Sequence, residues 1–264
     1  MPDCLSNIKE MDSLICSSNG LYRNFLGYGV EDTELFLVPE RDWNNFCRQR
    51  ELVDSSYGVY FPRNQRAVIR NENSLSLFHE YFGHGLYCEK SLMGRKLVEL
   101  EKKLLEEERQ EFSSRKFTLR DLKKFRQQNK TFKELENFRQ ENLVDYELFA
   151  IWTEYLLSET HGLKEEFGRK YDSLSGQDKD SVESVINFSK EYGNLATMYA
   201  QGMARRTTPE RVRGLLSDIY GNKLNDAIFA LLYGSKREFS DIDVFVVSDH
   251  ITPVINDWLD VRSY

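Results

Sequence analysis

The sequence predicts a predominantly helical α+β protein. Residues that favour β-strands cluster in short segments between positions 34 and 70, whereas apolar residues recur at three- and four-residue spacing over 97–142. A strongly apolar stretch follows over 143–157. We therefore expect a small sheet, a helix that carries two histidines and a helical hairpin in one domain, followed by a small α/β module.

Three short segments form the predicted sheet. Glu34–Val38 and 57–61 are rich in β-formers, and turn residues separate the second segment from a third at 67–70. The last two segments are expected to form a hairpin that leads directly into a helix. Asn73 or Ser74 can cap the start of that helix, because both side chains can accept hydrogen bonds from its first turn.

The helix after the hairpin carries the most informative motif of the chain. It contains His79, Glu80 and His84. In an HExxH zinc site, two imidazoles four residues apart bind the metal and the Glu acts as general base. Here the histidines are five residues apart, which would point the rings ~140° apart on an α-helix. Both can reach one metal only through a π-bulge, and Gly83 sits where such a bulge would fall.

The charged stretch 97–142 is interrupted at the serine pair 113–114 and is predicted to be a helical hairpin insertion. Its lysines and arginines form a solvated face, which requires no nucleic-acid partner. The following helix, 143–157, is apolar enough to lie in the core, yet it carries Glu147 and Glu154. These two carboxylates need an explanation.

A carboxylate in a core helix needs a cation or hydrogen-bond donors, because burying it alone costs several kcal/mol. Glu147 is therefore either a third metal ligand or an ion-pair partner of the charged hairpin. Glu154, two turns later, is the competing ligand. Cys88, one turn after His84, is either a buried thiol or a further ligand.

These elements resemble the gluzincin metallopeptidases, in particular the HExxGHG signature of the dipeptidyl peptidase III family. Residues 79–85 (HEYFGHG) match that signature at every fixed position. Residues 147–150 (ELFA) match the ExxA pattern that supplies the third ligand from a later helix in that family. The resemblance covers about residues 57–160 and leaves the exo- or endopeptidase mode and the peptide specificity open.

The resemblance implies that His79, His84 and Glu147 are zinc ligands and that Glu80 is the catalytic general base of peptide hydrolysis. A peptide hydrolase also needs a donor near the developing oxyanion. The candidates for that donor are His161, Tyr192 and Tyr199.

A second motif lies near the C-terminal end. The strand-like residues 231–233 lead into Gly234 and Ser235, and the next strand begins with Asp241 and Asp243, whose side chains share one side of a strand. Hard oxygen ligands beside a small-residue turn suit a magnesium-nucleotide site. This hG[GS]…DhDh pattern resembles the polymerase-β-like nucleotidyltransferase superfamily.

That resemblance implies magnesium at Asp241, Asp243 and Asp260, and a nucleotide triphosphate beside Gly234 and Ser235. The resemblance does not identify the acceptor of the nucleotidyl group, and nucleic acid is one candidate. Because few residues follow Asp260 in the sequence, we expect a truncated or non-catalytic module, or one that a protein partner completes. The simpler alternative is an exposed turn with acidic residues.

Bulk composition excludes some classes of protein. A net charge of -7 argues against a generally nucleic-acid-binding surface. The 4 cysteines form no CxxC pair, and the sequence has neither a signal-peptide pattern nor an apolar stretch of about 18 residues. We therefore expect a cytoplasmic protein without membrane contact.

The leading hypothesis is a zinc-dependent peptide hydrolase domain over 1–205, with the hairpin inserted at 97–142, fused to a nucleotidyltransferase-like module over 206–264. One alternative makes nucleotidyl transfer the main activity and the zinc domain structural or non-catalytic. The other is a non-catalytic regulatory protein that binds nucleotide.

Overall fold

The computed structural model describes most of the chain up to residue 172 and short pieces beyond it. The described residues are 2–50, 52, 57–71, 73–113, 117–172, 176, 179–180, 182–183, 185–187, 189–190, 227–233 and 243–248. Helices dominate them and a small sheet accompanies the helices, which confirms the predicted α+β class in outline. None of the described helices is both long and apolar enough to cross a lipid bilayer. The expected boundary near Arg206 lies outside the described residues.

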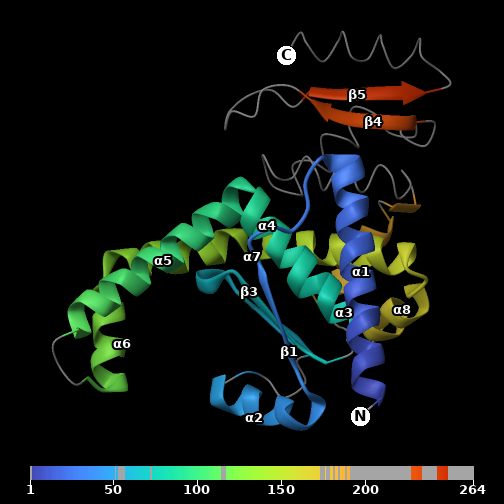
Figure 1. The fold of residues 1–264 in the computed structure, drawn as a ribbon. Coiled ribbons are helices and arrows are strands. Elements are labelled where there is room, and N and C mark those ends of the chain that lie inside the picture. Colours follow the sequence, from blue (N-terminus) through green and yellow to red (C-terminus); the bar gives the residue numbers. More distant parts are fainter. Residues whose placement is uncertain are drawn as a thin grey trace, which may run out of the picture.

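Strands β1 (Glu34–Val38), β2 (Gly58–Phe61) and β3 (Arg66–Arg70) form a sheet in the order β1-β3-β2 (Figure 1). The central strand β3 is parallel to β1 and antiparallel to β2, so the predicted hairpin is confirmed. Strands β2 and β3 are connected by a short helix, η1 (Pro62–Asn64), followed by Gln65 with a φ of 49°. Within the described residues, β2 is an outer strand with one unpaired edge.

One face of the sheet is covered by α2 (Glu40–Arg50), a helix that was not expected from the sequence. It follows Pro39 and buries Trp43 and Cys47 against Val68 of β3. Acidic residues in its first turn and basic residues in its last turn favour a helix, as does the spacing of its few apolar residues. The segment is so polar, and lies between two strand-like segments, that these helix signals were not recognised in the sequence.

The other face of the sheet packs against a continuous helical run made of α3 (Ser74–Ser76), η2 (Leu77–His84) and α4 (Gly85–Lys90). Asn73 caps the run, because its side chain accepts a hydrogen bond from the Ser76 backbone nitrogen at 2.7 Å. The middle piece, η2, is a π-helix. The predicted local departure from α-helical geometry is therefore confirmed.

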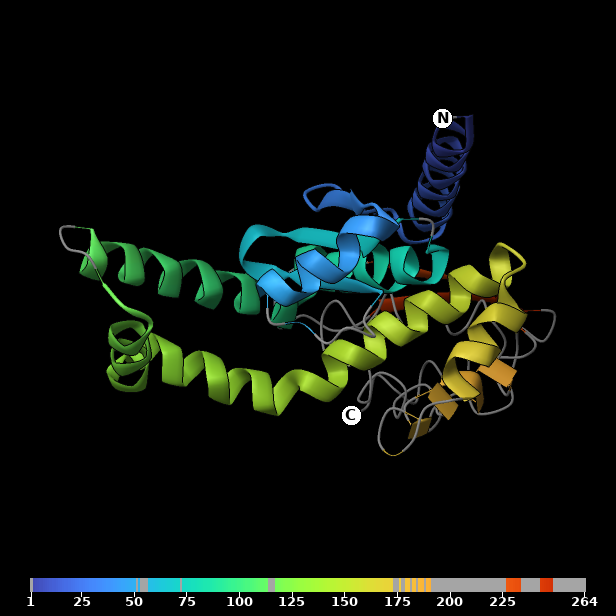
Figure 2. The ribbon, with the colours of Figure 1, turned by 90° about the horizontal axis from the view of Figure 1, so that it is seen from below.

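Three helices form an arm: α5 (Leu92–Phe112), α6 (Leu119–Gln128) and α7 (Lys130–Thr160). Figure 2 shows α5 and α7 side by side with α6 at the far end of the arm. The hairpin prediction is confirmed, but the helix start expected at residue 143 was wrong, since α7 continues unbroken from the arm into the core. It contains neither glycine nor proline, so nothing interrupts its hydrogen bonds where the composition changes.

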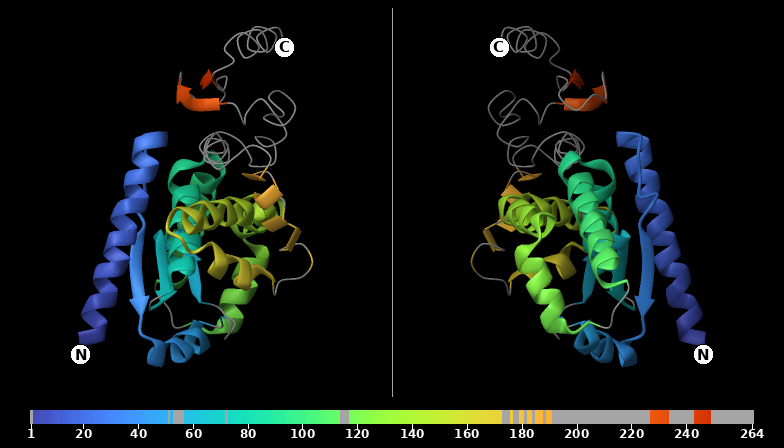
Figure 3. Two further views of the ribbon diagram at one scale, coloured as in Figure 1. Left: turned by 90° about the vertical axis from the view of Figure 1, so that its right-hand side faces the viewer. Right: turned by 90° about the vertical axis from the view of Figure 1, so that its left-hand side faces the viewer.

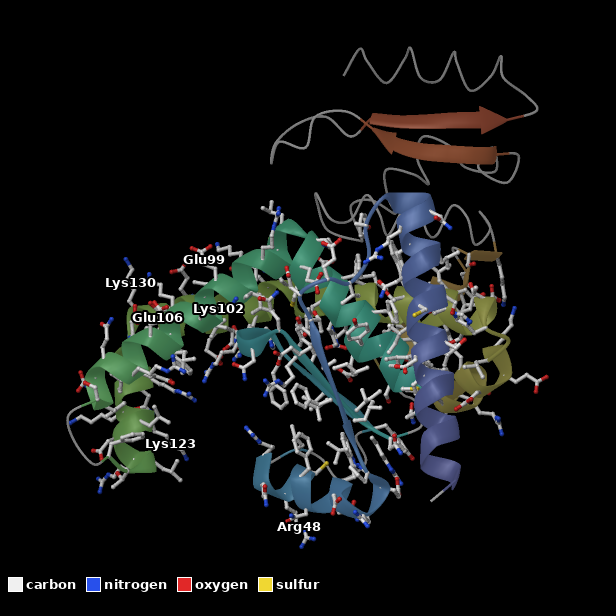
Figure 4. All side chains as sticks on the ribbon, in the orientation of Figure 1. Arg48, Glu99, Lys102, Glu106, Lys123 and Lys130 are labelled. Carbon is white, nitrogen blue, oxygen red and sulfur yellow. The ribbon has the colours of Figure 1, made fainter. Side chains whose placement is uncertain are left out.

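The outer surface of the arm carries charged side chains, as predicted. Its exposed members labelled in Figure 4 are Glu99, Lys102, Glu106, Lys123 and Lys130. Inside the arm, Glu108 accepts a hydrogen bond from Arg126 at 2.6 Å, and Glu101 accepts one from Arg139. At least two basic residues of the arm therefore have carboxylate partners within the chain.

Two further helices complete the described core, α1 (Pro2–Leu26) and α8 (Lys164–Asp172). Helix α1 was not expected; it runs along the outside of the sheet and helix layer (Figure 3). Its Tyr22 stacks on Phe82 of η2 with ring centroids 6.4 Å apart. In α7, Trp152 is fully buried in the same cluster. The two motif-bearing segments, η2 and the second half of α7, therefore pack in the interior.

Near the C-terminal end, β4 (Ala227–Tyr233) and β5 (Asp243–Ser248) pair antiparallel, with Tyr233 opposite Asp243. This agrees with the strands expected on either side of the second motif. The other residues predicted for the magnesium-nucleotide site lie outside the described residues: Gly234, Ser235, Asp241 and Asp260.

Candidate metal centre

The π-helix brings the two motif histidines together. Its backbone hydrogen bonds include one from the Gly85 nitrogen to the Glu80 oxygen, five residues earlier, so residues five apart lie above one another. The ring centroids of His79 and His84 are 4.8 Å apart and the ring planes are at 89°. A separation of five residues would point the two rings apart on an α-helix. On the π-helix the same separation places them side by side.

Gly83 and Ala150 allow η2 and α7 to approach closely. A Cβ at position 83 would lie 2.6 Å from the Ala150 Cα and 2.9 Å from its Cβ. Any side chain at this position would therefore collide with α7. Because Glu147 lies one turn before Ala150 on α7, this close contact holds its carboxylate beside the two imidazoles.

Three groups of the metal-ligating type converge at this point. Glu147 Oε2 lies 3.5 Å from His79 Nε2, and Glu147 Oε1 lies 3.9 Å from His84 Nε2. The ligand atoms of the three residues all lie within 4.8 Å of one another. Around tetrahedral zinc with bonds of about 2.0–2.1 Å, ligand atoms are about 3.4 Å apart. The set is wider than a zinc-bound triad and would have to contract around an ion.

Glu154 lies behind His79 and is not a member of the ligand triad. Its fully buried carboxylate accepts hydrogen bonds from Lys170 Nζ at 2.7 Å and from the Tyr171 hydroxyl, and it contacts His79 Nδ1 at 2.9 Å. Since an ionised carboxylate only accepts, His79 Nδ1 donates, and this leaves Nε2 to face the centre. Glu154 therefore orients the His79 ring, and these contacts disfavour the alternative of Glu154 as the competing ligand.

Stacking holds the second imidazole. His84 lies against the Tyr146 ring with centroids 3.9 Å apart and planes at 17°. Its Nδ1 is buried and has no hydrogen-bond partner among the described residues. One imidazole is therefore held by a carboxylate and the other by an aromatic face.

Glu80 lies next to the three ligand-type residues without being one of them. Its Oε2 is 4.0 Å from His84 Nε2, and its Cγ is 2.7 Å from the position that a Cβ on Gly58 would occupy. Burial raises the pKa of the Glu80 carboxyl to about 7. A carboxyl group with such a pKa can both accept and return a proton near neutral pH.

The three ligand-type groups have shifted pKa values. Burial alone would lower the pKa of His79, but hydrogen bonds with Glu147 and Glu154 raise it to about 10. Burial lowers the pKa of His84 to about 3. Burial opposes ionisation of Glu147, yet His84 and His79 bring its pKa to about 2. In the metal-free chain a proton on His79 thus faces an ionised Glu147, and a metal ion would displace that proton.

Of the remaining predicted residues, the structure describes His161 and Cys88. His161 Nε2 lies 2.9 Å from the Ser18 hydroxyl, and its ring stacks on Phe78, so it is not placed as an oxyanion donor. Tyr192 and Tyr199 lie outside the described residues. Cys88 is a thiol buried in the core, which agrees with the first of its two interpretations, a buried thiol rather than a further ligand.

Sequence reasoning missed three residues that support the centre: Tyr146, Lys170 and Tyr171. The only local signal was the position of Tyr146 directly before a candidate ligand. Lys170 and Tyr171 reach Glu154 from α8, and no pattern in the sequence links that helix to α7.

Replacing Glu154 by Gln is expected to lower zinc affinity about 10- to 100-fold, because the amide no longer holds the His79 ring as a carboxylate does. Competition with a chromophoric chelator measures this affinity. The matched control is Glu159→Gln on the same helix, where the carboxylate pairs with Lys164 and Tyr155. Equal zinc affinities for the Glu154 variant and the control would refute the orienting role.

Comparison with protein-family models, with curated proteins and with solved structures finds no significant match to this chain.

Proposed function

We propose that the domain predicted over 1–205 is a zinc-dependent peptide hydrolase. The observation that carries the proposal is the convergence of His79, His84 and Glu147, from a π-helix and a separate buried helix, with Glu80 beside them. Two histidines and a carboxylate form the donor set of catalytic zinc sites, which keep a fourth position open. The alternative role of Glu147 as a partner of the charged arm is disfavoured, since its ion pairs are with the two imidazoles.

When bound, zinc would supply Lewis-acid polarisation of the scissile carbonyl and of a water molecule. The chain's own contribution to the chemistry comes from Glu80, which takes a proton from the attacking water and passes it to the leaving amine. Its pKa of about 7 suits both transfers. Glu154 and Tyr146 hold the two imidazoles in place during this cycle.

The neighbourhood of Glu80 suits a peptide. Strand β2 is one of the two outer strands of the described three-stranded sheet, and its Gly58 lies directly against the Glu80 side chain. An unpaired strand edge offers backbone donors and acceptors to an extended chain, and such pairing is a general mode of peptide recognition. A substrate added to β2 would pass beside the proposed general base.

Metal loading tests the proposal. The zinc-supplemented protein is expected to hold one zinc ion per chain and to hydrolyse members of a mixed peptide library, with both properties lost on chelation and restored by zinc. Glu147→Ala should lose the metal, whereas Glu141→Ala, an exposed carboxylate on the same helix, should retain it. Metal analysis and mass spectrometry of the library give the two readouts. A wild-type protein that holds no zinc after supplementation would refute the peptidase.

A second candidate function concerns the C-terminal strands. The antiparallel pairing of β4 and β5 places Asp243 opposite Tyr233, next to the predicted Gly234-Ser235 turn, and so supports a strand-turn-strand nucleotide site. The function would be nucleotidyl transfer or regulatory nucleotide binding, with magnesium held by Asp241, Asp243 and Asp260.

Labelled nucleoside triphosphate is expected to bind the full chain in the presence of magnesium, and Asp243→Asn is expected to weaken that binding at least about tenfold, because the amide loses a charged ligand. Equilibrium dialysis with and without magnesium measures the binding. Covalent transfer of the label separates a transferase from a regulatory site, and binding that is unchanged in the variant would overturn both.

A further inference from the structure

The face of α7 that carries Glu147 continues as an exposed apolar surface one turn towards the helix start. Leu143 and Val144 precede Glu147 by four and three residues, so their side chains flank its direction on the helix. They are 56% and 41% exposed. Helical side chains lean towards the N-terminal end, so the Glu147 carboxylate lies over the turn that carries this pair. The apolar pair therefore lies one helical turn from Glu147, on the side towards which its carboxylate leans.

This exposure contrasts with the preceding turns of α7. The exposed residues there are polar or charged: Lys133, Glu134, Asn137, Arg139, Gln140 and Glu141. Leu143 and Val144 interrupt that pattern, and within the described part of the chain they are the only exposed large hydrophobic residues adjacent in sequence. Apolar surface at the mouth of a polar site is typical of a wall that receives part of a ligand.

A peptide in the centre would bring a side chain to this surface. Gly58 of β2 contacts Glu80, whereas α7 supplies Glu147, so β2 and α7 both border the place where the scissile bond must lie. Successive side chains of an extended peptide point to opposite sides. A residue next to the cleaved bond is therefore within reach of the turn that carries Leu143 and Val144.

We propose that Leu143 and Val144 select peptides with an apolar side chain at a residue that adjoins the scissile bond, an inference that rests on the proposed peptide hydrolysis. Water leaves both surfaces when such a side chain packs on the pair, whereas an acidic or strongly hydrated side chain gains nothing there. One methylene group more or less in contact with an apolar surface changes kcat/KM between two substrates by about 10- to 200-fold.

The experiment uses the zinc-loaded full chain and a synthetic peptide mixture analysed by mass spectrometry. Leu, Ile, Val, Met and Phe are expected to be enriched on one side of the cleaved bonds. Leu143→Lys should reduce the ratio of kcat/KM for an apolar peptide to that for its Asp analogue by at least about tenfold, because the new ammonium group attracts the carboxylate. Val144→Thr, which keeps the side-chain shape, should reduce the apolar preference less.

The matched control is Leu119→Lys, which makes the same chemical change at a 75% exposed leucine on α6. It should leave the preference unchanged. A gain in cleavage of acidic peptides by Leu143→Lys cannot result from misfolding, so it supports the inference directly. Hydrolysis with the same preference in Leu143→Lys and wild type would overturn the inference and leave the peptidase standing. Absence of hydrolysis by the zinc-loaded wild type would overturn the peptidase and this inference with it.

Discussion

Peptide hydrolysis is expected to fall by about a thousandfold in Glu80→Gln while zinc remains bound. The amide has nearly the shape of the carboxyl group but cannot accept a proton from water or return it to the leaving amine. Glu80 borders the ligand triad without belonging to it, so its loss should leave the metal in place. Single-turnover hydrolysis and zinc content, measured on the same preparation, give the two readouts.

Two observations separate this result from misfolding. Burial raises the pKa of Glu80 from 4.5 to about 7, so between these pH values the unfolded chain loses this proton while the folded metal-free chain keeps it. The stability that this group contributes is therefore lost between pH 4.5 and about 7, and the Gln variant should be at least as stable as wild type at pH 8. The matched control is Glu108→Gln, an amide replacement at a buried carboxylate of the arm, which should keep full activity. Residual hydrolysis within tenfold of wild type in Glu80→Gln would contradict the assignment.

The geometry at His79 and His84 could be predicted from the sequence because it depends on local periodicity. A five-residue separation admits joint ligation only on a helix with an extra residue per turn, and Gly83 marked the position. In place of the single π-bulge that was predicted, the structure has a longer π-helix, η2. The argument that a buried carboxylate needs a cation or a donor also pointed to Glu147, but its side chain is 41% exposed, so the argument applies to the fully buried Glu154 instead.

Other features depend on contacts between segments far apart in the sequence, and local patterns do not encode them. Glu154 has the same sequence context as Glu147, yet Lys170 and Tyr171 reach it from α8 and turn it into a support for His79. The length of α7 also escaped prediction. A change from charged to apolar composition near residue 143 indicated a new helix, but composition alone does not end a helix that lacks glycine and proline.

Gly83→Ala is expected to destabilise the chain by about 1–3 kcal/mol and to lower zinc affinity by more than about tenfold. The added methyl group would lie 2.6 Å from the Ala150 Cα, so η2 and α7 must separate. Two of the proposed ligands lie on η2 and the third lies on α7, so the separation opens the triad as well as the core. Urea unfolding of the metal-free chain and chelator competition measure the two effects separately.

The sign of this prediction depends on two opposing effects at one position. Alanine is favoured over glycine inside a helix by about 1 kcal/mol, which alone would make the variant more stable. Gly168→Ala on α8 isolates that gain, since nothing lies within 4 Å of a Cβ there, and this control should be neutral or more stable with unchanged zinc affinity. At position 83 the contact is with a backbone atom that no rotamer change can move, so overpacking outweighs the helix preference. Equal zinc affinity in Gly83→Ala and Gly168→Ala would mean that the close contact of η2 with α7 does not position Glu147.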